Sequence, residues 1–337
     1  MKKIVVLGGG RQGRVIASDL SRHAQVSVAD VRPLELAGTT WLEADLAKPE
    51  TLVRIIREHD LAVGALPSRL GYGAAHAAVE ARRPYVDIAF FAEDPVLLHR
   101  EALRAGVPVM LDCGLAPGLS NLLVGRALAR GNPEEIHIQV GGVAADPRRP
   151  YGYVVTWSLE DLLEEYTRPA RIVRGGAAVA VPVFSELVRI EVEGVGEMES
   201  FLTDGLRSLL ECGVREMTEK TLRWPGHVEA VRPLLASGRF VEELRSRCAD
   251  GDDLVVLLID VVRKGKRERL TMLDRARSGL SAMSRTTALT CAAFARWVAE
   301  GGVDQVGLLP PEKIGFDERA VRFILDALAA HGMRISA

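Results

Sequence analysis

The chain has 337 residues, of which 48% are hydrophobic and 26% are charged, so it can form one large or two medium domains with their own cores. Its formal net charge of −2 gives no overall attraction to nucleic acid or to anionic lipid. The four cysteines are far apart and form no CxxC pair, which argues against a bound metal and favours reduced thiols.

The N-terminal segment carries two lysines, but the apolar run behind them spans only Ile4–Leu7. That run is too short for a secretory signal, and no apolar stretch in the sequence is long enough to cross a membrane. We therefore expect a cytoplasmic protein without a membrane partner.

Short apolar runs alternate with amphipathic segments in the first third of the chain. Because a crossover helix covers each step between parallel strands, this rhythm predicts a doubly wound α/β domain. The predicted strands are Ile4–Leu7, Val26–Ala29, Trp41–Ala44, Leu61–Ala65, Tyr85–Ile88 and Val107–Leu111. The predicted helices are Arg11–Ser21, Glu50–Arg57, Gly71–Ala81 and Pro95–Ala105.

The rhythm changes after about Gly131, where strand-like segments follow one another without crossover helices. This pattern predicts a mostly antiparallel sheet in a second, α+β domain. Helical periodicity returns from Ser284, and we expect the late helices to fold back onto the first domain. The strand-like segments are Ile136–Val143, Tyr153–Trp157, Leu187–Val192, Glu197–Phe201, Leu254–Arg263 and Glu268–Leu273, and the late helices are Ala288–Glu300 and Asp317–His331.

The first predicted strand runs directly into a glycine-rich segment that opens the first helix. Gly8 allows the tight turn, Gly10 lets the backbone approach a pyrophosphate, and Gly13 lets the helix pack closely on the strand. The N–H groups and the dipole at the helix N-terminus favour an anion. The segment therefore predicts a bound dinucleotide, with Gly8, Gly10, Arg11, Gln12 and Gly13 at the cofactor.

Asp30 closes the second predicted strand. Its carboxylate is suited to accept hydrogen bonds from the adenosine ribose hydroxyls and to repel a 2′-phosphate, which favours NAD over NADP. Arg11 and Arg32 leave NADP open, since either arginine could pair with such a phosphate. The further residues that we expect at the cofactor are Val31, Arg32, Asp45, Ala65, Leu66 and Pro67.

Two acidic residues follow the fifth and sixth predicted strands, at the sheet edge where open α/β sheets bind ligands. Asp87 and Asp112 are candidate bases, and a helix cap or a structural hydrogen bond explains each of them equally well. His227 is a third candidate, because an ordinary histidine pKa of about 6.5 allows proton acceptance at neutral pH. The alternative to this role is a structural one, in which His227 is a partly buried histidine in a turn.

Four segments carry the most distinctive residue combinations: Val6–Gly10, Asp112–Asn121, Thr156–Arg171 and Thr221–His227. Together with Asp204–Ser208 and Ser281–Arg285, they resemble the saccharopine dehydrogenase superfamily, and most closely its lysine 6-dehydrogenase branch.

The resemblance implies a discontinuous Rossmann domain, residues 1–117 and 285–337, with an inserted substrate-binding and dimerisation domain, residues 118–284. It implies a homodimer or a higher homo-oligomer. It also implies an NAD-dependent amino-acid dehydrogenase that oxidises the L-lysine ε-amine, giving ammonia and 2-aminoadipate 6-semialdehyde, which cyclises. Saccharopine-forming and carboxynorspermidine-forming relatives are typically longer, which favours the lysine 6-dehydrogenase branch.

The α-carboxylate of such a substrate requires a cation, and a planar guanidinium is its natural bidentate partner. Arg223 is the first choice, because the resembling proteins place an arginine of this segment at the substrate carboxylate. Arg168 and Arg171 are second choices, and ion pairing with Glu164 and Glu165 is their alternative role.

The rest of the amino acid requires a pocket wall and an anion for the α-ammonium group. Tyr166 is a candidate for the wall, although aromatic residues at such positions also pack in cores. Asp204 and Glu165 are the candidates for the anion.

Two other functions fit the same sequence. The first is a reductase of the superfamily that forms saccharopine or carboxynorspermidine with NADPH, against which Asp30 argues. The second is a Rossmann-type NAD sensor or scaffold without turnover, against which the dense polar residues of the middle segments argue. No cluster of metal ligands is visible in the sequence.

Overall fold

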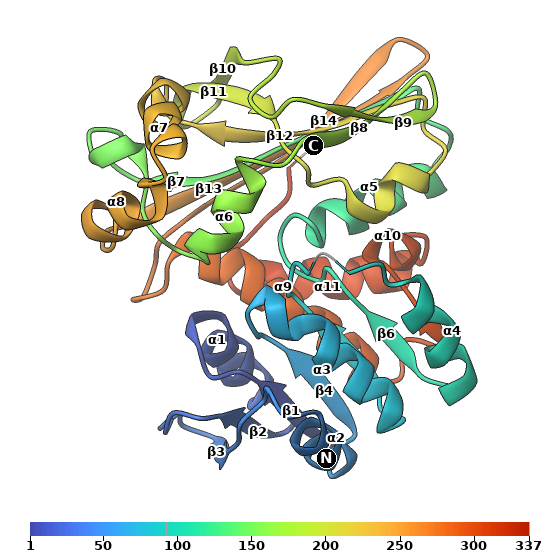
Figure 1. Ribbon diagram of the computed structural model, residues 1–337. Helices are drawn as coiled ribbons and strands as arrows, with labels where there is room; N and C mark the ends of the chain where they lie inside the picture. The colour runs from blue at the N-terminus through green and yellow to red at the C-terminus, as the bar shows by residue number, and fades with distance from the viewer. Residues whose placement is uncertain (92, 337) are drawn as a thin grey trace. The chain divides into compact units, whose positions relative to one another are not determined.

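The computed structural model describes residues 1–91 and 93–336 (Figure 1). The chain divides into two compact units: residues 1–126 with 284–331, and residues 127–283 with 332–336. The first unit is thus discontinuous in sequence, and the second is inserted into it. The expected boundaries differ from these units in two ways: residues 118–126 and Ser284 belong to the first unit, and residues 332–336 belong to the second.

Contacts between residues far apart in sequence account for both differences. Asn121, on helix α5 (Leu119–Ala129), donates through Nδ2 to Glu312 Oε2 at 3.2 Å. A Cβ atom on Gly125 would lie 2.0 Å from the backbone oxygen of Glu312, so the two segments pack closely. Ser336 and Thr271 exchange backbone hydrogen bonds of 2.9 and 2.8 Å.

Parallel strands form the seven-stranded sheet of the first unit (Figure 1). Their order, β15-β6-β5-β4-β1-β2-β3, contains the 3-2-1-4-5-6 order of dinucleotide-binding sheets, and β15 extends one edge. The order reverses between β1 and β4, which is where such sheets hold a ligand. The strands are β1 (Lys3–Leu7), β2 (Gln25–Asp30), β3 (Thr39–Glu43), β4 (Leu61–Gly64), β5 (Tyr85–Asp87), β6 (Pro108–Met110) and β15 (Gly307–Leu308).

Helices with small or apolar buried faces pack around this sheet. In α3, alanines 74, 75, 77 and 78 are buried, and their small side chains let the helix pack closely. The helices are α1 (Arg11–Leu20), α2 (Pro49–Arg57), α3 (Ser68–Glu80), α4 (Val96–Ala105), α5, α9 (Ala282–Ala299), α10 (Pro311–Ile314) and α11 (Glu318–Ala330). Among the described residues, none of the helices is long and apolar enough to span a bilayer.

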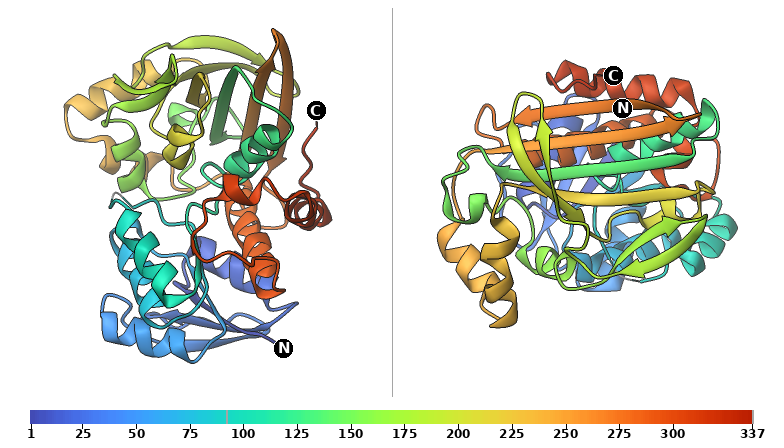
Figure 2. Two further views of the ribbon diagram at one scale, coloured as in Figure 1. Left: turned by 90° about the vertical axis from the view of Figure 1, so that its right-hand side faces the viewer. Right: turned by 90° about the horizontal axis from the view of Figure 1, so that it is seen from above.

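The second unit contains an eight-stranded sheet, whose long strands β7, β12, β13 and β14 lie side by side in the right-hand view of Figure 2. Most pairs are antiparallel, as expected, but β7 and β12 run parallel. The strands are β7 (Glu135–Ala144), β8 (Ala170–Arg174), β9 (Ala177–Val181), β10 (Val188–Val192), β11 (Gly196–Leu202), β12 (Glu216–Arg223), β13 (Asp253–Arg263) and β14 (Lys266–Arg275).

One predicted strand of the second unit was wrong, and three strands were not predicted. Tyr153–Trp157 follows a short 3₁₀ turn, and its apolar side chains pack into an aromatic core rather than a sheet. Strands β8, β9 and β12 were not predicted, because charged residues or small alanines mask the alternation of polar and apolar residues along them. The helices of this unit are α6 (Leu159–Glu165), α7 (His227–Ala236) and α8 (Phe240–Arg247).

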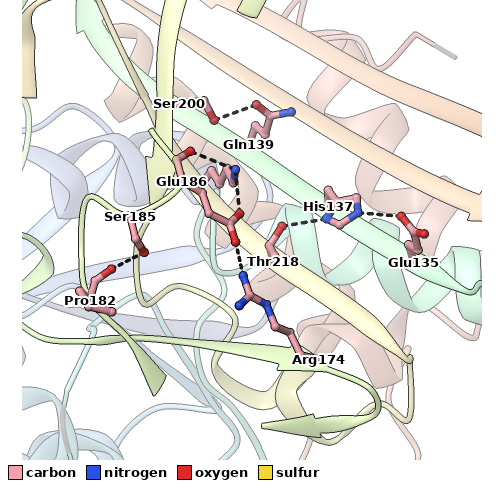
Figure 3. Close-up of polar contacts among 10 residues, drawn as sticks. Glu135, His137, Gln139, Arg174, Pro182, Ser185, Glu186, Ser200 and Thr218 are labelled. Carbon is pink, nitrogen blue, oxygen red and sulfur yellow. Dashed lines mark hydrogen bonds and ion pairs between the residues drawn. The ribbon is translucent and has the colours of Figure 1, made fainter. Parts of the chain in front are cut away.

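The two faces of this sheet differ, because successive side chains of a strand point to opposite sides. Thr218 lies on the face shown in Figure 3, and Lys220, two residues further along β12, points to the same side. There His137 contacts Thr218 Oγ1 at 2.8 Å and Glu135 Oε2 at 3.1 Å, while Lys220 pairs with Glu186 at 3.1 Å. These contacts tie β12 to its neighbours, and we assign this polar network a structural role.

Candidate functional site

The glycine turn of the first unit has the geometry of a phosphate-binding loop. Gly8 has a φ of +103°, which L side chains rarely adopt, and a Cβ on Gly13 would lie 1.9 Å from the Gly8 carbonyl oxygen. A Cβ on Gly10, the N-cap of α1, would meet nothing within 4 Å. Gly8 and Gly13 are therefore required by the fold itself, whereas Gly10 faces open space at a helix N-terminus.

Asp30 is fixed beside this turn. Its Oδ2 accepts from the Gly9 N–H at 2.7 Å, and its Oδ1 accepts from the Arg32 N–H at 2.9 Å. Each carboxylate oxygen has a second lone pair, so the group can still accept hydrogen bonds from ribose hydroxyls. The Arg32 side chain is largely exposed, and its Nε lies 4.0 Å from Asp30 Oδ1. The exposed Arg11 begins α1.

Two buried polar atoms flank the point where the strand order reverses. Gln12 Oε1, in the first turn of α1, and Ser68 Oγ, at the start of α3, have no hydrogen-bond partner among the described residues. Ala65, which follows β4, lies against the turn, because a Cβ on Gly8 would be 2.7 Å from its carbonyl oxygen. The phosphates, ribose hydroxyls and amide of a dinucleotide would supply such partners, so the residues fit this cofactor.

Ser68 was absent from the predicted cofactor residues. Its sequence signal is its position directly after Leu66 and Pro67, at the first residue of the helix that follows β4. Asp45, which was predicted, instead bonds locally: its Oδ1 accepts from the Ala47 N–H at 3.1 Å, and its Oδ2 lies 3.6 Å from Lys48.

Val31 directly follows Asp30 and is 58% exposed. An exposed apolar side chain next to the ribose-binding candidate could cover an adenine ring. The exposure supports keeping Val31 in the proposed cofactor site.

Asp87 is enclosed in the first unit. Its carboxylate is fully buried and accepts from the Tyr85 hydroxyl at 2.7 Å and from the Ala89 N–H at 2.6 Å. Burial raises the pKa of Asp87 to about 6. A Cβ on Gly64 would lie 2.7 Å from its Oδ1, so the neighbouring strand closes over it. These contacts favour the structural alternative that the sequence left open, and the role of Asp87 as a base stays a prediction.

Asp112 lies just after β6, with a φ of +58°. It is 9% exposed, whereas Asp87 is fully buried, so Asp112 is the more accessible of the two aspartates. Asp112 therefore stays our prediction for the proton acceptor. The kcat of an Asp112→Asn variant should fall by about 100-fold or more if it is the base.

Three predicted residues meet in the second unit, although they come from separate segments. Arg223 Nε donates to the Tyr166 hydroxyl oxygen at 2.7 Å, and that oxygen lies 3.0 Å from His227 Nε2. His227 Nδ1 lies 2.7 Å from the Tyr151 carbonyl oxygen. All three side chains belong to the buried part of the unit, so these bonds form one enclosed chain of polar contacts.

The surroundings of His227 keep it neutral. Burial and the positive charge of Arg223 lower the pKa of His227 to about 3. Both ring nitrogens already have partners, namely Tyr151 and Tyr166. A pKa near 3 makes the ring a weak base, and both of its nitrogens are already hydrogen-bonded, so the contacts favour a structural role for His227; its role as a general base stays a prediction.

Arg168 and Arg171 pair with an aspartate that the sequence did not connect to them. Arg171 forms two hydrogen bonds with the Asp204 carboxylate, of 2.8 and 2.9 Å, and Arg168 Nε lies 3.2 Å from Asp204 Oδ2. These ion pairs occupy both arginines and Asp204. The pairs favour a structural cluster, and the roles of Arg168, Arg171 and Asp204 at a substrate stay predictions.

Glu165 is the carboxylate that remains near Arg223. Its Oε1 accepts from the Thr221 hydroxyl at 2.7 Å, and its charge acts on the Arg223 guanidinium. In the part of the chain that the structure describes, no group of three or more His, Cys, Asp or Glu side chains is arranged to hold a metal ion.

The parallel sheet, its strand order and the glycine turn define a dinucleotide-binding protein of the Rossmann class. Residues 4–110 match the saccharopine dehydrogenase NADP binding domain, and residues 114–333 match the saccharopine dehydrogenase C-terminal domain. The chain therefore belongs to the saccharopine dehydrogenase family.

Similar proteins agree with this assignment. Alpha-aminoadipic semialdehyde synthase of Arabidopsis thaliana is 20% identical over 269 residues, which are 74% of this chain and 25% of that protein. Saccharopine dehydrogenase [NADP(+), L-glutamate-forming] of Saccharomyces cerevisiae is 21% identical over 190 residues, 52% of this chain and 43% of that protein. The matches thus span less than half of either relative.

A solved structure shows the same fold. Apo saccharopine dehydrogenase (L-Glu forming) from Saccharomyces cerevisiae superposes with a TM-score of 0.79 and 17% identity, covering 100% of this chain and 99% of that one.

Proposed function

We propose that the protein is an NAD-dependent dehydrogenase that oxidises the ε-carbon of L-lysine and releases ammonia. The observation that carries the substrate class is a buried cation with an anion held nearby: Arg223 bonds Tyr166, and Glu165, the residue before Tyr166, bonds Thr221 on the strand of Arg223. An amino acid presents the complementary pair, an α-carboxylate and an α-ammonium group. Family membership and the fit of the glycine turn to a dinucleotide support the cofactor.

Arg223 has donors left for a carboxylate. Its Nε and Nη1 bond Tyr166 and the Leu222 carbonyl oxygen, whereas its Nη2 has no hydrogen-bond partner among the described residues. Since a guanidinium has five N–H donors, two bonds leave several for the substrate. Glu165 keeps Oε2 for the α-ammonium group, while Thr221 holds its other oxygen.

The reaction also requires proton removal. A lysine ε-amine, with a pKa of about 10.4, is mostly protonated at neutral pH, and its lone pair must be free before a hydride can leave the adjacent carbon. We assign that proton to Asp112. When bound, the nicotinamide would accept the hydride, so that lysine, NAD⁺ and water give the semialdehyde, ammonium, NADH and a proton.

The test is NAD reduction with L-lysine as the sole substrate at mildly alkaline pH, with ammonia measured in parallel. We expect reduced cofactor and ammonia in equal amounts, and no signal without an amine. Ornithine and saccharopine serve as comparison substrates. Turnover of saccharopine with no turnover of lysine would contradict the proposal, and so would cofactor binding without any turnover.

Two truncated substrates test the pair of head-group contacts separately. 1,5-Diaminopentane lacks the carboxylate that Arg223 would bind, and 6-aminohexanoate lacks the ammonium group that Glu165 would bind. We expect the KM of each compound to be at least about tenfold higher than the KM of lysine, because each compound loses one charge-assisted contact. Equal KM values for all three compounds would exclude the Arg223–Glu165 pair as the head-group site.

A saccharopine-type reaction with NADP is the second candidate. It is favoured by the activity for which the yeast relative is named and by the exposed Arg32 next to Asp30. The same assay, run with saccharopine and both cofactors, distinguishes the two functions.

Asp30 should set the cofactor preference. We expect wild type to prefer NAD, because the Asp30 carboxylate, held in place by the Gly9 and Arg32 N–H groups, repels a 2′-phosphate. Asp30→Asn removes the charge at constant size and should lower the NAD-to-NADP preference about tenfold. The measurement is kcat/KM for both cofactors, with Asp45→Asn as the control that should leave the ratio unchanged. A preference that stays the same in Asp30→Asn would contradict the assignment.

A further inference from the structure

Hydrogen bonds link His227, Tyr166 and Arg223 in a row, which we call the hydrogen-bond file. Only one placement of the protons satisfies every bond of this file. The Tyr151 carbonyl oxygen can only accept, so His227 Nδ1 carries the proton of that 2.7 Å bond. In the neutral ring Nε2 then accepts, and the Tyr166 hydroxyl donates to it over 3.0 Å. The lone pairs of the same hydroxyl are thereby free to accept from Arg223 Nε at 2.7 Å.

We propose that His227 is a positioning residue, which directs the Tyr166 hydroxyl so that it holds Arg223 in the orientation for a substrate carboxylate. The substrate part of this inference rests on the proposed function, whereas the hydrogen-bond file does not.

A protonated His227 would break the file. Its Nε2 would become a donor, and the Tyr166 oxygen would face donors from both His227 and Arg223, with its own proton displaced. Two cations would also share one buried site, at a high electrostatic cost. The neutral ring is thus the state that the geometry requires.

The surroundings hold His227 and Arg223 in place. His227 is the first residue of α7, and the N–H groups of its neighbours Gly226 and Val228 donate to the Glu199 carboxylate at 2.9 and 2.7 Å. This carboxylate caps the helix and fixes the backbone on both sides of the ring.

Aromatic rings restrain the guanidinium as well. Its Cζ lies 5.4 Å from the Tyr153 ring centroid and 5.6 Å from the Tyr166 ring centroid. Rings confine a guanidinium without fixing which of its N–H groups points where. The Tyr166 hydroxyl supplies that direction, and His227 supplies the direction of the hydroxyl.

The kinetic test compares His227→Leu with His227→Gln. Leucine keeps much of the volume without an acceptor, whereas the glutamine amide oxygen can take the place of Nε2. His227→Leu should raise the KM for lysine about tenfold and leave kcat within about threefold, and His227→Gln should restore the KM. A general base would behave oppositely: both variants would lose kcat, and the acidic limb of the pH–kcat profile would disappear. That outcome would overturn the proposal.

Tyr166→Phe keeps the ring packing and removes only the hydroxyl. It should raise the KM as much as His227→Leu, and the double variant should be no worse than either single one, because both break the same file. Additive effects in the double variant would show that the two residues act separately. This variant also decides the matter if His227→Leu does not fold.

A spectroscopic test needs no turnover. Nitrogen-15 NMR of labelled histidines in the full chain, assigned with His227→Gln, should show a neutral Nδ1–H ring at residue 227 between about pH 5 and 9. An Nε2–H ring, or protonation near pH 6.5, would overturn the file even if lysine is the substrate. A correct tautomer together with no lysine turnover would instead reject the proposed function and retain the file.

Discussion

Replacing Arg223 with alanine should raise the KM for lysine by about 100-fold or more and leave the affinity for NAD unchanged. A hydrogen bond to a charged group contributes about 1.5–3 kcal/mol, and a carboxylate would lose two of them together. The residue belongs to the second unit, whereas the glycine turn belongs to the first. Steady-state kinetics with lysine and a separate titration with NAD measure the two quantities.

Matched variants separate binding from structure. Arg171→Ala removes a guanidinium that is paired with Asp204, and it should leave the KM for lysine within about threefold. Arg223→Lys keeps the charge but loses the fork, so its KM should lie between those of wild type and Arg223→Ala. The KM for 1,5-diaminopentane, which lacks a carboxylate, should be unaffected by Arg223→Ala. An equal rise for this amine would indicate a general distortion of the site.

Gly13→Ala and Gly10→Ala should fail in different ways. At Gly13 the new Cβ would lie 1.9 Å from a backbone oxygen that cannot move aside easily, so the variant should lose about 3 kcal/mol or more of stability. At Gly10 the Cβ meets nothing within 4 Å, so the melting temperature should stay the same. The methyl group would instead occupy the space of the pyrophosphate, and the affinity for NAD should fall about tenfold or more.

Gly73→Ala is the control for both variants. Gly73 lies inside α3, and a Cβ there also meets nothing within 4 Å. Alanine in a helix interior should stabilise the protein by about 0.5–1 kcal/mol and leave NAD binding unaltered. Thermal melting with and without NAD measures all three variants. Full NAD affinity in Gly10→Ala would exclude the glycine turn as the pyrophosphate site.

The first unit was largely predictable because buried parallel strands appear in sequence as uninterrupted apolar runs. Val5 and Val63 are examples, since both lie in such runs and both are fully buried. The second unit was less predictable. In β12, the charged residues Glu219 and Arg223 are buried in the folded unit, whereas a hydropathy pattern predicts that charged residues lie at the surface.

The candidate site was also predictable only in part. Arg223, Tyr166 and His227 could be selected singly, from residue type and resemblance. Their mutual contacts, across 57 and 61 residues, depend on how the chain folds. The pKa of a side chain depends on burial and neighbouring charges, so the sequence suggested a base at His227 where the fold provides a neutral hydrogen-bonding ring.

The interrupted first unit imposes an order on biosynthesis. A ribosome delivers β6 early, but β15, its parallel neighbour at the sheet edge, emerges only after the whole inserted sheet. The inserted segment, residues 127–283, is continuous and can therefore collapse around its own core. At that stage the sheet of the first unit still lacks its last strand, β15. Closing the first unit then joins segments separated by well over a hundred residues, and contacts of such long separation form slowly. The nascent chain thus exposes the β6 edge for the time needed to translate the insertion.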